Sequence, residues 1–160
     1  DNMRSTTEET NQLITDGIYA AALDPNKTFG PPVAKQPVPY FNFAPLKNAL
    51  ARLLHAAGEF DYVAMSASAS SEEINKLLYT SERLLTRDAG LDGREWYKHH
   101  VYAPGFYTGY GVKTIPGVRE AIEQRDYDKV EPQIAIAADV LNAMADRVEL
   151  LSARLNGEST

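Results

Sequence analysis

The sequence predicts an all-α fold, namely a four-helix bundle with a long ordered loop between the third and the last long helix. Apolar residues recur three and four positions apart over most of the chain, which is the spacing of one helix face. Alternating strand patterns are nearly absent. The third observation is residues 90–117, GLDGREWYKHHVYAPGFYTGYGVKTIPG, a connection too long and too apolar for a plain surface linker.

The first helix is expected over residues 6–23. Thr6 and Glu9 have the spacing of a capping box, in which each side chain satisfies an exposed backbone N–H of the other. Gly17 weakens this helix, because glycine is a poor helix former. Residues 24–40 contain five prolines, so we expect an extended crossover between helices there.

The second helix is expected over residues 43–67, and the third from Ser70 to an end between Arg87 and Gly90. Glu73 lies three residues after Ser70, which gives a second capping box. The predicted apolar stripe of the second helix consists of Leu46, Leu50, Leu53, Leu54, Ala57, Phe60 and Ala64. The predicted face of the third helix consists of Ile74, Leu77, Leu78, Ser81, Leu84 and Leu85.

A short helix is expected over residues 116–125 and the last long helix over residues 128–155. Pro132 must lie in the first turn of the last helix, where its missing N–H does no harm, so the cap is either Asp128 or Glu131. The apolar seam of this helix is unbroken: Val130, Ile134, Ala137, Leu141, Met144, Val148, Leu151 and Leu155. Such a seam is typical of a helix packed lengthwise in a bundle.

Length and composition fit one domain over residues 1–160, with frayed ends at 1–5 and 156–160. Hydrophobic residues make up 44% of the chain, which is enough for a core at this size. The chain begins at Asp1 rather than at methionine, and we interpret it as a fragment of a longer protein.

Charge and cysteine content exclude several classes of function. The net charge of −6 argues against nucleic-acid binding, which needs a basic surface. No apolar run approaches the ~20 residues of a membrane span, so no membrane insertion by this segment is expected. The absence of cysteine excludes disulfides, thiolate metal sites and cysteine nucleophiles.

The chain shows no complete catalytic set, so we expect no catalytic residue, no metal ligand and no cofactor in it. His99 and His100 are neighbours, and neighbouring side chains in an extended segment point in opposite directions. We therefore expect one buried, hydrogen-bonded histidine and one exposed histidine rather than a metal site. No G-x-S-x-G nucleophile motif and no phosphate-binding glycine loop is present.

Aromatic residues dominate the loop: Trp96, Tyr97, Tyr102, Phe106, Tyr107 and Tyr110. Tyrosine combines apolar area with one hydroxyl, which suits interfaces and small-molecule sites. We expect Trp96, Tyr97 and Tyr102 to fill the end of the bundle. Tyr107 and Tyr110 are flanked by glycines, so filling the bundle end and binding a partner both remain open for them.

Arg94-Glu95-Trp96-Tyr97-Lys98-His99, Tyr102-Ala103-Pro104 and Ile115-Pro116-Gly117 are the motifs that carry a family resemblance. They resemble the transferrin receptor-like dimerisation domain, the C-terminal helical domain of glutamate carboxypeptidase II and the transferrin receptor. The resemblance covers residues 43–144, from the second helix through Gln133 into the last. It implies a four-helix bundle that pairs two subunits, so the expected partners are a second copy and the peptidase domain of the same parent chain.

The resemblance also implies a parent protein of the M28 metallopeptidase type, or an inactive relative of one. Its two zinc ions would lie in a peptidase domain outside this chain, so the chain alone is not expected to be an enzyme. The location implied for the parent is the secretory pathway, the vacuole or the cell surface.

In the carboxypeptidases of this family, the loop supplies a Lys-Tyr pair to the pocket for the substrate's C-terminal glutamate. An ungapped count places Tyr110 at the tyrosine position and Gly109 at the lysine position, and Lys113 lies close enough in sequence to substitute. The resemblance therefore implies recognition of a free peptide C-terminus by Tyr110, without glutamate specificity. The alternative is a non-catalytic receptor-like or scaffold module that binds another protein.

Overall fold

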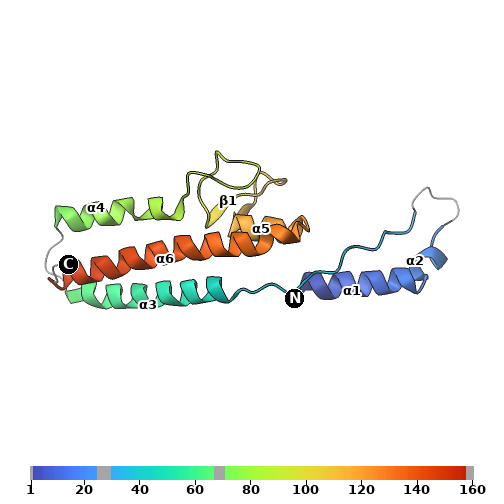
Figure 1. Ribbon diagram of the computed structural model, residues 1–160, viewed down its shortest axis with the longest axis horizontal. Helices are drawn as coiled ribbons and strands as arrows, with labels where there is room; N and C mark the ends of the chain where they lie inside the picture. Colours follow the sequence, from blue (N-terminus) through green and yellow to red (C-terminus); the bar gives the residue numbers. More distant parts are fainter. Residues whose placement is uncertain (1, 25–29, 67–70, 158–160) are drawn as a thin grey trace. The chain divides into compact units, whose positions relative to one another are not determined.

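A computed structural model describes residues 2–24, 30–66 and 71–157. The chain divides into two compact units, residues 1–40 and residues 41–160. The single domain expected over residues 1–160 stays a prediction. Figure 1 labels the elements of each unit.

The first unit contains helix α1 (Asn2–Thr15) and the short helix α2 (Ile18–Ala21). The predicted helix over residues 6–23 is therefore wrong at its start and in its continuity, and Thr6 lies inside α1 instead of capping it. Gly17 separates the two helices with a φ of 72°, a left-handed conformation that glycine adopts without steric cost. The residue that weakened the prediction is the residue at which the helix breaks.

Residues 30–40 of the first unit form neither helix nor strand, as the proline content of residues 24–40 predicted, and residues 25–29 of that segment lie outside the described residues. The Asn11 side chain pairs with the backbone of Lys35, donating to its carbonyl at 2.7 Å and accepting from its N–H at 2.9 Å. Arg4 Nε donates to the Val38 carbonyl at 2.9 Å, and its guanidinium lies over the Tyr40 ring. Side chains of α1 thus satisfy backbone groups that a segment without secondary structure leaves free.

The second unit is built around helix α6 (Val130–Leu155), which lies between α3 (Ala44–Ser66) and α4 (Glu72–Thr80) (Figure 1). The 3₁₀ helix η1 (Ser81–Leu85) continues α4. The third helix therefore ends before the predicted range of Arg87 to Gly90.

Two short elements precede α6, namely α5 (Pro116–Glu123) and the 3₁₀ helix η2 (Tyr127–Lys129). Pro132 lies in the first turn of α6, as predicted. The cap of α4 is Ser71, whose hydroxyl accepts from the Ile74 N–H at 3.2 Å. The predicted capping residue, Ser70, lies outside the described residues.

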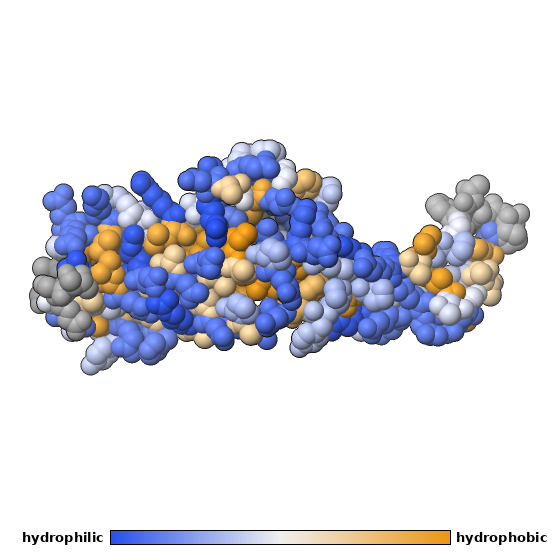
Figure 2. All heavy atoms as spheres, in the orientation of Figure 1, coloured by the Kyte–Doolittle hydropathy of each residue, from blue (hydrophilic) through white to orange (hydrophobic). Residues whose placement is uncertain are grey.

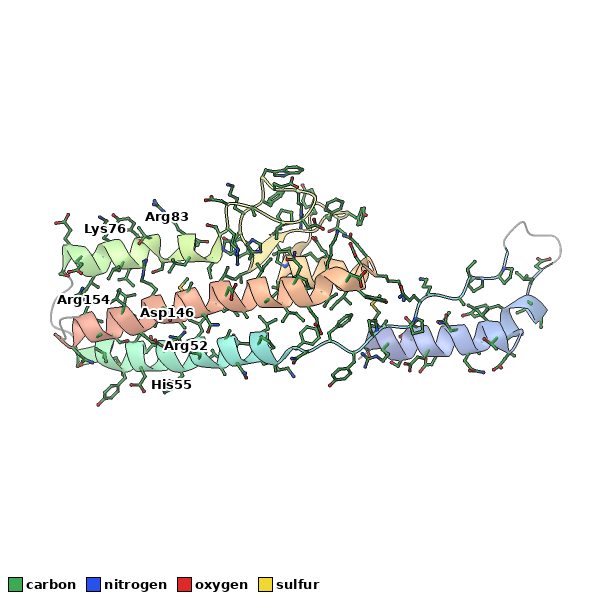
Figure 3. All side chains as sticks on the ribbon, in the orientation of Figure 1. Arg52, His55, Lys76, Arg83, Asp146 and Arg154 are labelled. Carbon is green, nitrogen blue, oxygen red and sulfur yellow. The ribbon has the colours of Figure 1, made fainter. Side chains whose placement is uncertain are left out.

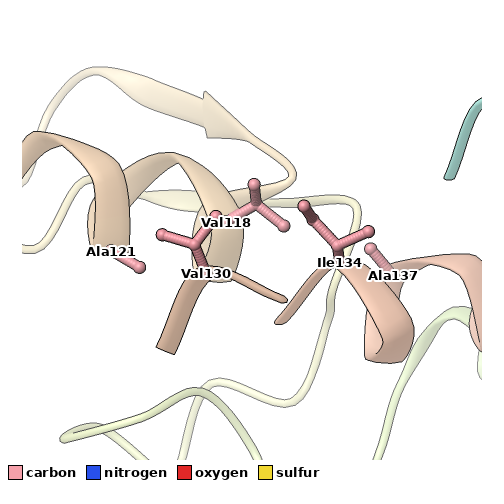
Figure 4. Close-up of a cluster of buried hydrophobic side chains, with 5 residues drawn as sticks. All are labelled: Val118, Ala121, Val130, Ile134 and Ala137. Carbon is pink, nitrogen blue, oxygen red and sulfur yellow. The ribbon is translucent and has the colours of Figure 1, made fainter. Parts of the chain in front are cut away.

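The core of the second unit forms where α5 meets α6. Val118 and Ala121 from α5 pack against Val130, Ile134 and Ala137 from α6 (Figure 4). Every residue of the predicted α6 seam is buried or half-buried. The burial extends further around α6 to Ala138, Val140 and Ala145, because helices pack on two of its sides.

The interface between α3 and α6 is flanked by charged side chains. Arg52 on α3 contacts Asp146 at 2.5 Å and Glu149 at 2.7 Å on α6, and Figure 3 shows Arg52 and Asp146 reaching toward one another. On the face seen in Figure 2, hydrophobic residues gather along the second unit between such polar groups. No helix among the described residues has the length and hydropathy needed to cross a bilayer.

The predicted stripe of α3 is wrong in its orientation. The buried residues are Ala49, Ala56 and Val63, while Leu50 and Leu54 are 47% and 65% exposed. Leu46, Leu53 and Phe60 are half-buried beside the buried alanines and valine. The sequence contains two overlapping three-four patterns, and the one through the small residues faces α6. Small side chains let two helices approach closely.

The all-α prediction is confirmed in part, since a two-stranded antiparallel sheet accompanies the helices. Strands β1 (Tyr102–Pro104) and β2 (Val112–Thr114) pair Tyr102 with Thr114 and Pro104 with Val112. Three residues are too few for an alternating pattern to emerge from the sequence. The chain is thus mostly helical with one small sheet, and the closed four-helix bundle stays a prediction.

Candidate functional site

The loop between η1 and α5 is the candidate site, and backbone hydrogen bonds fold it onto itself. The Arg87 N–H donates to the Lys98 carbonyl at 2.9 Å, and the Leu91 N–H donates to the Tyr97 carbonyl at 2.8 Å. The Ile115 N–H also donates to the carbonyl of Val101, the residue before Tyr102. The segment is therefore an ordered surface structure of the kind that carries functional residues.

Gly90 makes one turn of this loop possible. Its φ is 69°, and a Cβ atom there would lie 2.1 Å from the Glu95 carbonyl oxygen. The obstructing atom belongs to the backbone, so it cannot move aside as a flexible side chain could. Glycine is therefore required at this position for steric and conformational reasons.

An ion pair between Arg94 and Glu120 holds the loop on α5. Arg94 Nη2 donates to both carboxylate oxygens of Glu120, at 2.7 and 2.8 Å, and the two residues are only 4% and 8% exposed. Buried charges are costly unless they are paired and hydrogen-bonded, and this two-bond geometry meets that condition.

The same pair fixes both sides of the turn after β1. The Arg94 guanidinium also donates to the Pro104 carbonyl, and the Phe106 N–H donates to Glu120 Oε1 at 2.8 Å. The guanidinium lies 5.3 Å from the centroid of the Tyr97 ring, a cation–π contact. Arg94 lies in a motif of the sequence that predicted no role for it. Glu120 was not predicted, because its only signal is a position one turn after Pro116 on the same face of α5.

The tip of the loop carries Tyr110, the candidate recognition residue. The Gly105 N–H donates to the Gly111 carbonyl at 2.9 Å and closes the tip, and Gly109 has a φ of 60°. Tyr110 is 102% exposed, so its ring and its hydroxyl stand free in solvent, and Tyr107 is also largely exposed. Neither of these two tyrosines fills the bundle end in this structure.

Lys113 does not join Tyr110 in one site. Its ammonium lies 2.7 Å from Glu123 Oε2 and 2.9 Å from Oε1, and its side chain is mostly buried. The hydrogen bond from Lys113 holds the pKa of Glu123 below its ordinary value. Gly109, at the family's lysine position, offers no charge, so neither candidate supplies a free cation beside Tyr110.

A cavity of about 260 Å³ opens beside the tip. Its lining includes Phe106, Tyr107, Lys113, Glu120 and Glu123. The carboxylates of the two glutamates already accept hydrogen bonds from partners in the chain. The charged side chains of the lining, Lys113, Glu120 and Glu123, are therefore each held in an ion pair.

The two histidines depart from prediction, because neither is fully exposed. His100 is buried, and the exposed fraction of the His99 side chain is small. His99 Nδ1 accepts from the N–H groups of Val101 and Tyr102 at 3.2 and 3.1 Å. Burial lowers the pKa of both histidines, and the charge of Arg87 lowers that of His100 further. Over the described ranges, no group of three or more histidine, aspartate or glutamate side chains could hold a metal ion.

Trp96 also departs from prediction, because it is 72% exposed and does not fill the bundle end. Tyr102 is half-exposed and donates through its hydroxyl to Glu82 Oε1 at 2.7 Å, which raises the pKa of the tyrosine. The Tyr102 ring lies 4.0 Å from that of His99. The Tyr102–Glu82 hydrogen bond therefore holds β1 against η1.

Comparison with known proteins places most of this unit in one family. A family model described as the transferrin receptor-like dimerisation domain matches residues 41–149. The chain is 43% identical over 60 residues to "Probable glutamate carboxypeptidase LAMP1" of Arabidopsis thaliana, covering 38% of this chain and 9% of that protein. It is 30% identical over 82 residues to "Probable glutamate carboxypeptidase" of Arthroderma benhamiae, covering 47% of this chain and 11% of that protein. The chain thus spans about a tenth of the length of these curated relatives.

Proposed function

Because the chain belongs to the transferrin receptor-like dimerisation domain family, we propose that it pairs two copies of a glutamate carboxypeptidase-like peptidase. The family match and the second compact unit start at the same residue, Phe41, which supports residues 41–160 as the pairing domain proper. In this proposal the helices around α6 belong to a four-helix bundle, and this bundle pairs with that of a second copy.

The zinc chemistry of the parent belongs to a peptidase domain outside this chain. The described residues gather no set of metal ligands, and the buried carboxylate of Glu120 is already paired with an arginine. In this proposal the chain contributes the pairing of two subunits and the recognition of the substrate. The parent would lie in the secretory pathway, in the vacuole or at the cell surface.

The loop tip contributes to the pocket that holds the substrate's C-terminus. The observation that carries this proposal is the Tyr110 hydroxyl, fully exposed on a loop that the buried Arg94–Glu120 pair fixes in place. A phenol can donate one hydrogen bond to a carboxylate, and a hydrogen bond to a charged partner is a strong one. Lys113 is engaged by Glu123, so a second carboxylate on the substrate gains no cation from this loop.

Replacing Tyr110 with phenylalanine in the full-length parent tests this role. We expect KM to rise roughly ten- to a hundredfold, because a hydrogen bond to a charged group contributes about 1.5–3 kcal/mol. The fold should be unaffected, since the side chain is fully exposed. Tyr107→Phe is the matched control, because it removes a hydroxyl from another exposed tyrosine of the tip. Kinetics of Tyr110→Phe that equal those of the wild type would contradict the assignment.

A second candidate function is a non-catalytic receptor-like or scaffold module. It is favoured by the exposure of Trp96, Tyr107 and Tyr110 on one loop, because exposed aromatic residues are frequent anchors of protein interfaces. The two candidate functions predict different residues in the peptidase domain of the parent protein. An intact set of zinc ligands there supports the peptidase, and a degraded set supports the receptor-like module.

A further inference from the structure

Helix α3 carries a second apolar stripe that its own core does not use. Lys47, Leu50, Leu54, Ala57, Asp61 and Ala64 follow one another at intervals of three and four residues. At 100° per residue this stripe lies roughly 100° around the helix from the face packed on α6. Leu50 and Leu54, its largest members, are exposed. A leucine stripe of this kind is typical of a helix that packs against another helix.

The charges on this stripe are arranged symmetrically. Lys47 and Asp61 each lie seven residues from Leu54, in opposite directions. Among the described residues neither has a salt-bridge partner, whereas Arg52 on the α6 side of the same helix is paired twice. Two copies of α3 packed antiparallel about Leu54 would bring each Lys47 beside Asp61 of the second copy. Parallel copies would instead bring like charges together, which is unfavourable.

We propose that α3 pairs antiparallel with α3 of a second copy, with Leu54 at the two-fold axis. This inference rests on the proposed dimerisation function and names the surface that performs it. A two-fold interface uses the same patch on both subunits, so the patch must be complementary to itself. The stripe meets this requirement, with leucines at the centre, one cation at one end and one anion at the other.

The sizes of the side chains fit the same arrangement. The fifteen residues from Lys47 to Asp61 span about 21 Å of helix, at about 1.5 Å per residue. In antiparallel register Leu50 of one copy lies opposite Gly58 and next to Ala57 of the other. These small residues leave room for the leucine side chain, as a knob fits into a hole. Met65, which is exposed near the end of α3, continues the apolar surface.

Charge reversal tests the pairing by sedimentation equilibrium on the 160-residue chain. Lys47→Glu and Asp61→Lys should each raise the dimer dissociation constant at least tenfold, because each places like charges together twice. The double variant Lys47→Glu/Asp61→Lys should restore most of the affinity, since the pair is reversed in both copies. Lys76→Glu, on the exposed face of α4, is the matched control and should change nothing.

Crosslinking gives a second, independent test. The chain has no cysteine, so Leu54→Cys introduces a unique thiol. At the two-fold axis the introduced thiols of the two subunits lie beside each other. A bismaleimide reagent should therefore link them and yield a covalent dimer. Tyr79→Cys on α4 is a control of similar exposure, 68% against 65%, and should remain monomeric on a denaturing gel.

The results distinguish a wrong α3 interface from a wrong dimerisation function. A wild-type dimer whose affinity ignores both single charge reversals, with no Leu54→Cys crosslink, overturns the α3 interface and leaves dimerisation intact. A wild-type chain that stays monomeric in these experiments overturns the pairing function itself. The α3 interface is supported if each single charge reversal weakens the dimer affinity and the double variant restores it. A Leu54→Cys crosslink is the third result that supports it.

Discussion

At the scale of single residues, Arg94 and Glu120 are the pair that joins the loop to α5. They come from segments 26 residues apart, and their charges meet where almost no water reaches them. Glu120 also holds the backbone of Phe106, so one carboxylate connects α5, the turn and the arginine. The loop that carries the exposed Tyr110 is therefore held on α5 by a buried ion pair.

Removing one member of this pair should be costly. Glu120→Ala leaves a buried, unpaired guanidinium, and we expect the free energy of unfolding to fall by about 3–5 kcal/mol. The double variant Arg94→Met/Glu120→Leu should recover part of this loss, limited by the Pro104 carbonyl and the Phe106 N–H that lose their partners. Urea denaturation measures both. As a control, Glu149→Gln, in an exposed pair, should cost much less. A Glu120→Ala variant as stable as Glu149→Gln would contradict the account.

The buried histidines make stability depend on pH. The pKa of His100 is lowered in the folded chain by burial first and by Arg87 second, and its Nε2 is buried without a hydrogen-bond partner in the part of the chain that the structure describes. Below the ordinary histidine pKa of about 6.5 the unfolded chain takes up protons more readily than the folded one. Stability is therefore fully present above about pH 6.5 and falls as the pH drops below it.

The pH dependence of urea unfolding between pH 7.5 and 5 measures this effect. The His100→Leu variant should lose less stability over that interval than the wild type, because one of the two depressed histidines is gone. The pH dependence of the unfolding free energy that remains in this variant comes from His99, whose pKa is also lowered by burial. Identical slopes for variant and wild type would show that His100 does not titrate differently in the two states.

At the scale of elements, α6 could be predicted from the sequence and α3 only in part. The α6 seam is correct because helices pack on two of its sides, so any regular apolar pattern on it is buried. On α3 two patterns compete, and the choice between them depends on a neighbour that the local sequence does not specify. The larger leucines favoured the exposed pattern in the prediction, while Ala49 and Ala56 face the core.

Aspartate substitutions distinguish the two leucine environments. Leu141 is buried against Ala49 and Ala138, so Leu141→Asp places an unpaired charge in the core and should unfold the second unit. Leu54→Asp changes an exposed residue of α3 and should leave the helical circular dichroism spectrum intact. A folded Leu141→Asp protein would show that the α6 seam is misassigned.

The elements that the sequence did not predict are those set by contacts between distant residues. The pairing of β1 with β2 requires two three-residue segments to meet, and neither carries a strand pattern of its own. The Arg94–Glu120 pair likewise joins a loop to a helix face. Gly17 is a partly local case: its residue type weakened the predicted helix, although the break at this residue was not predicted.

At the scale of the whole molecule, the family and the second compact unit describe the same part of the chain. The matched residues, 41–149, contain α3, the loop and most of α6. The loop motifs were enough to predict this family from the sequence, because glycine, proline and aromatic residues at fixed spacing are more specific than helix periodicity. The division at residue 40 was not predicted, since the proline-rich segment there resembles an ordinary crossover.

Pairing of this chain with a second copy underlies both proposals. Sedimentation equilibrium on the isolated 160-residue chain over the micromolar range tests it most directly. We predict a concentration-dependent equilibrium between monomer and dimer, with the dimer prevailing at micromolar concentration. A single monomeric species throughout that range would contradict it.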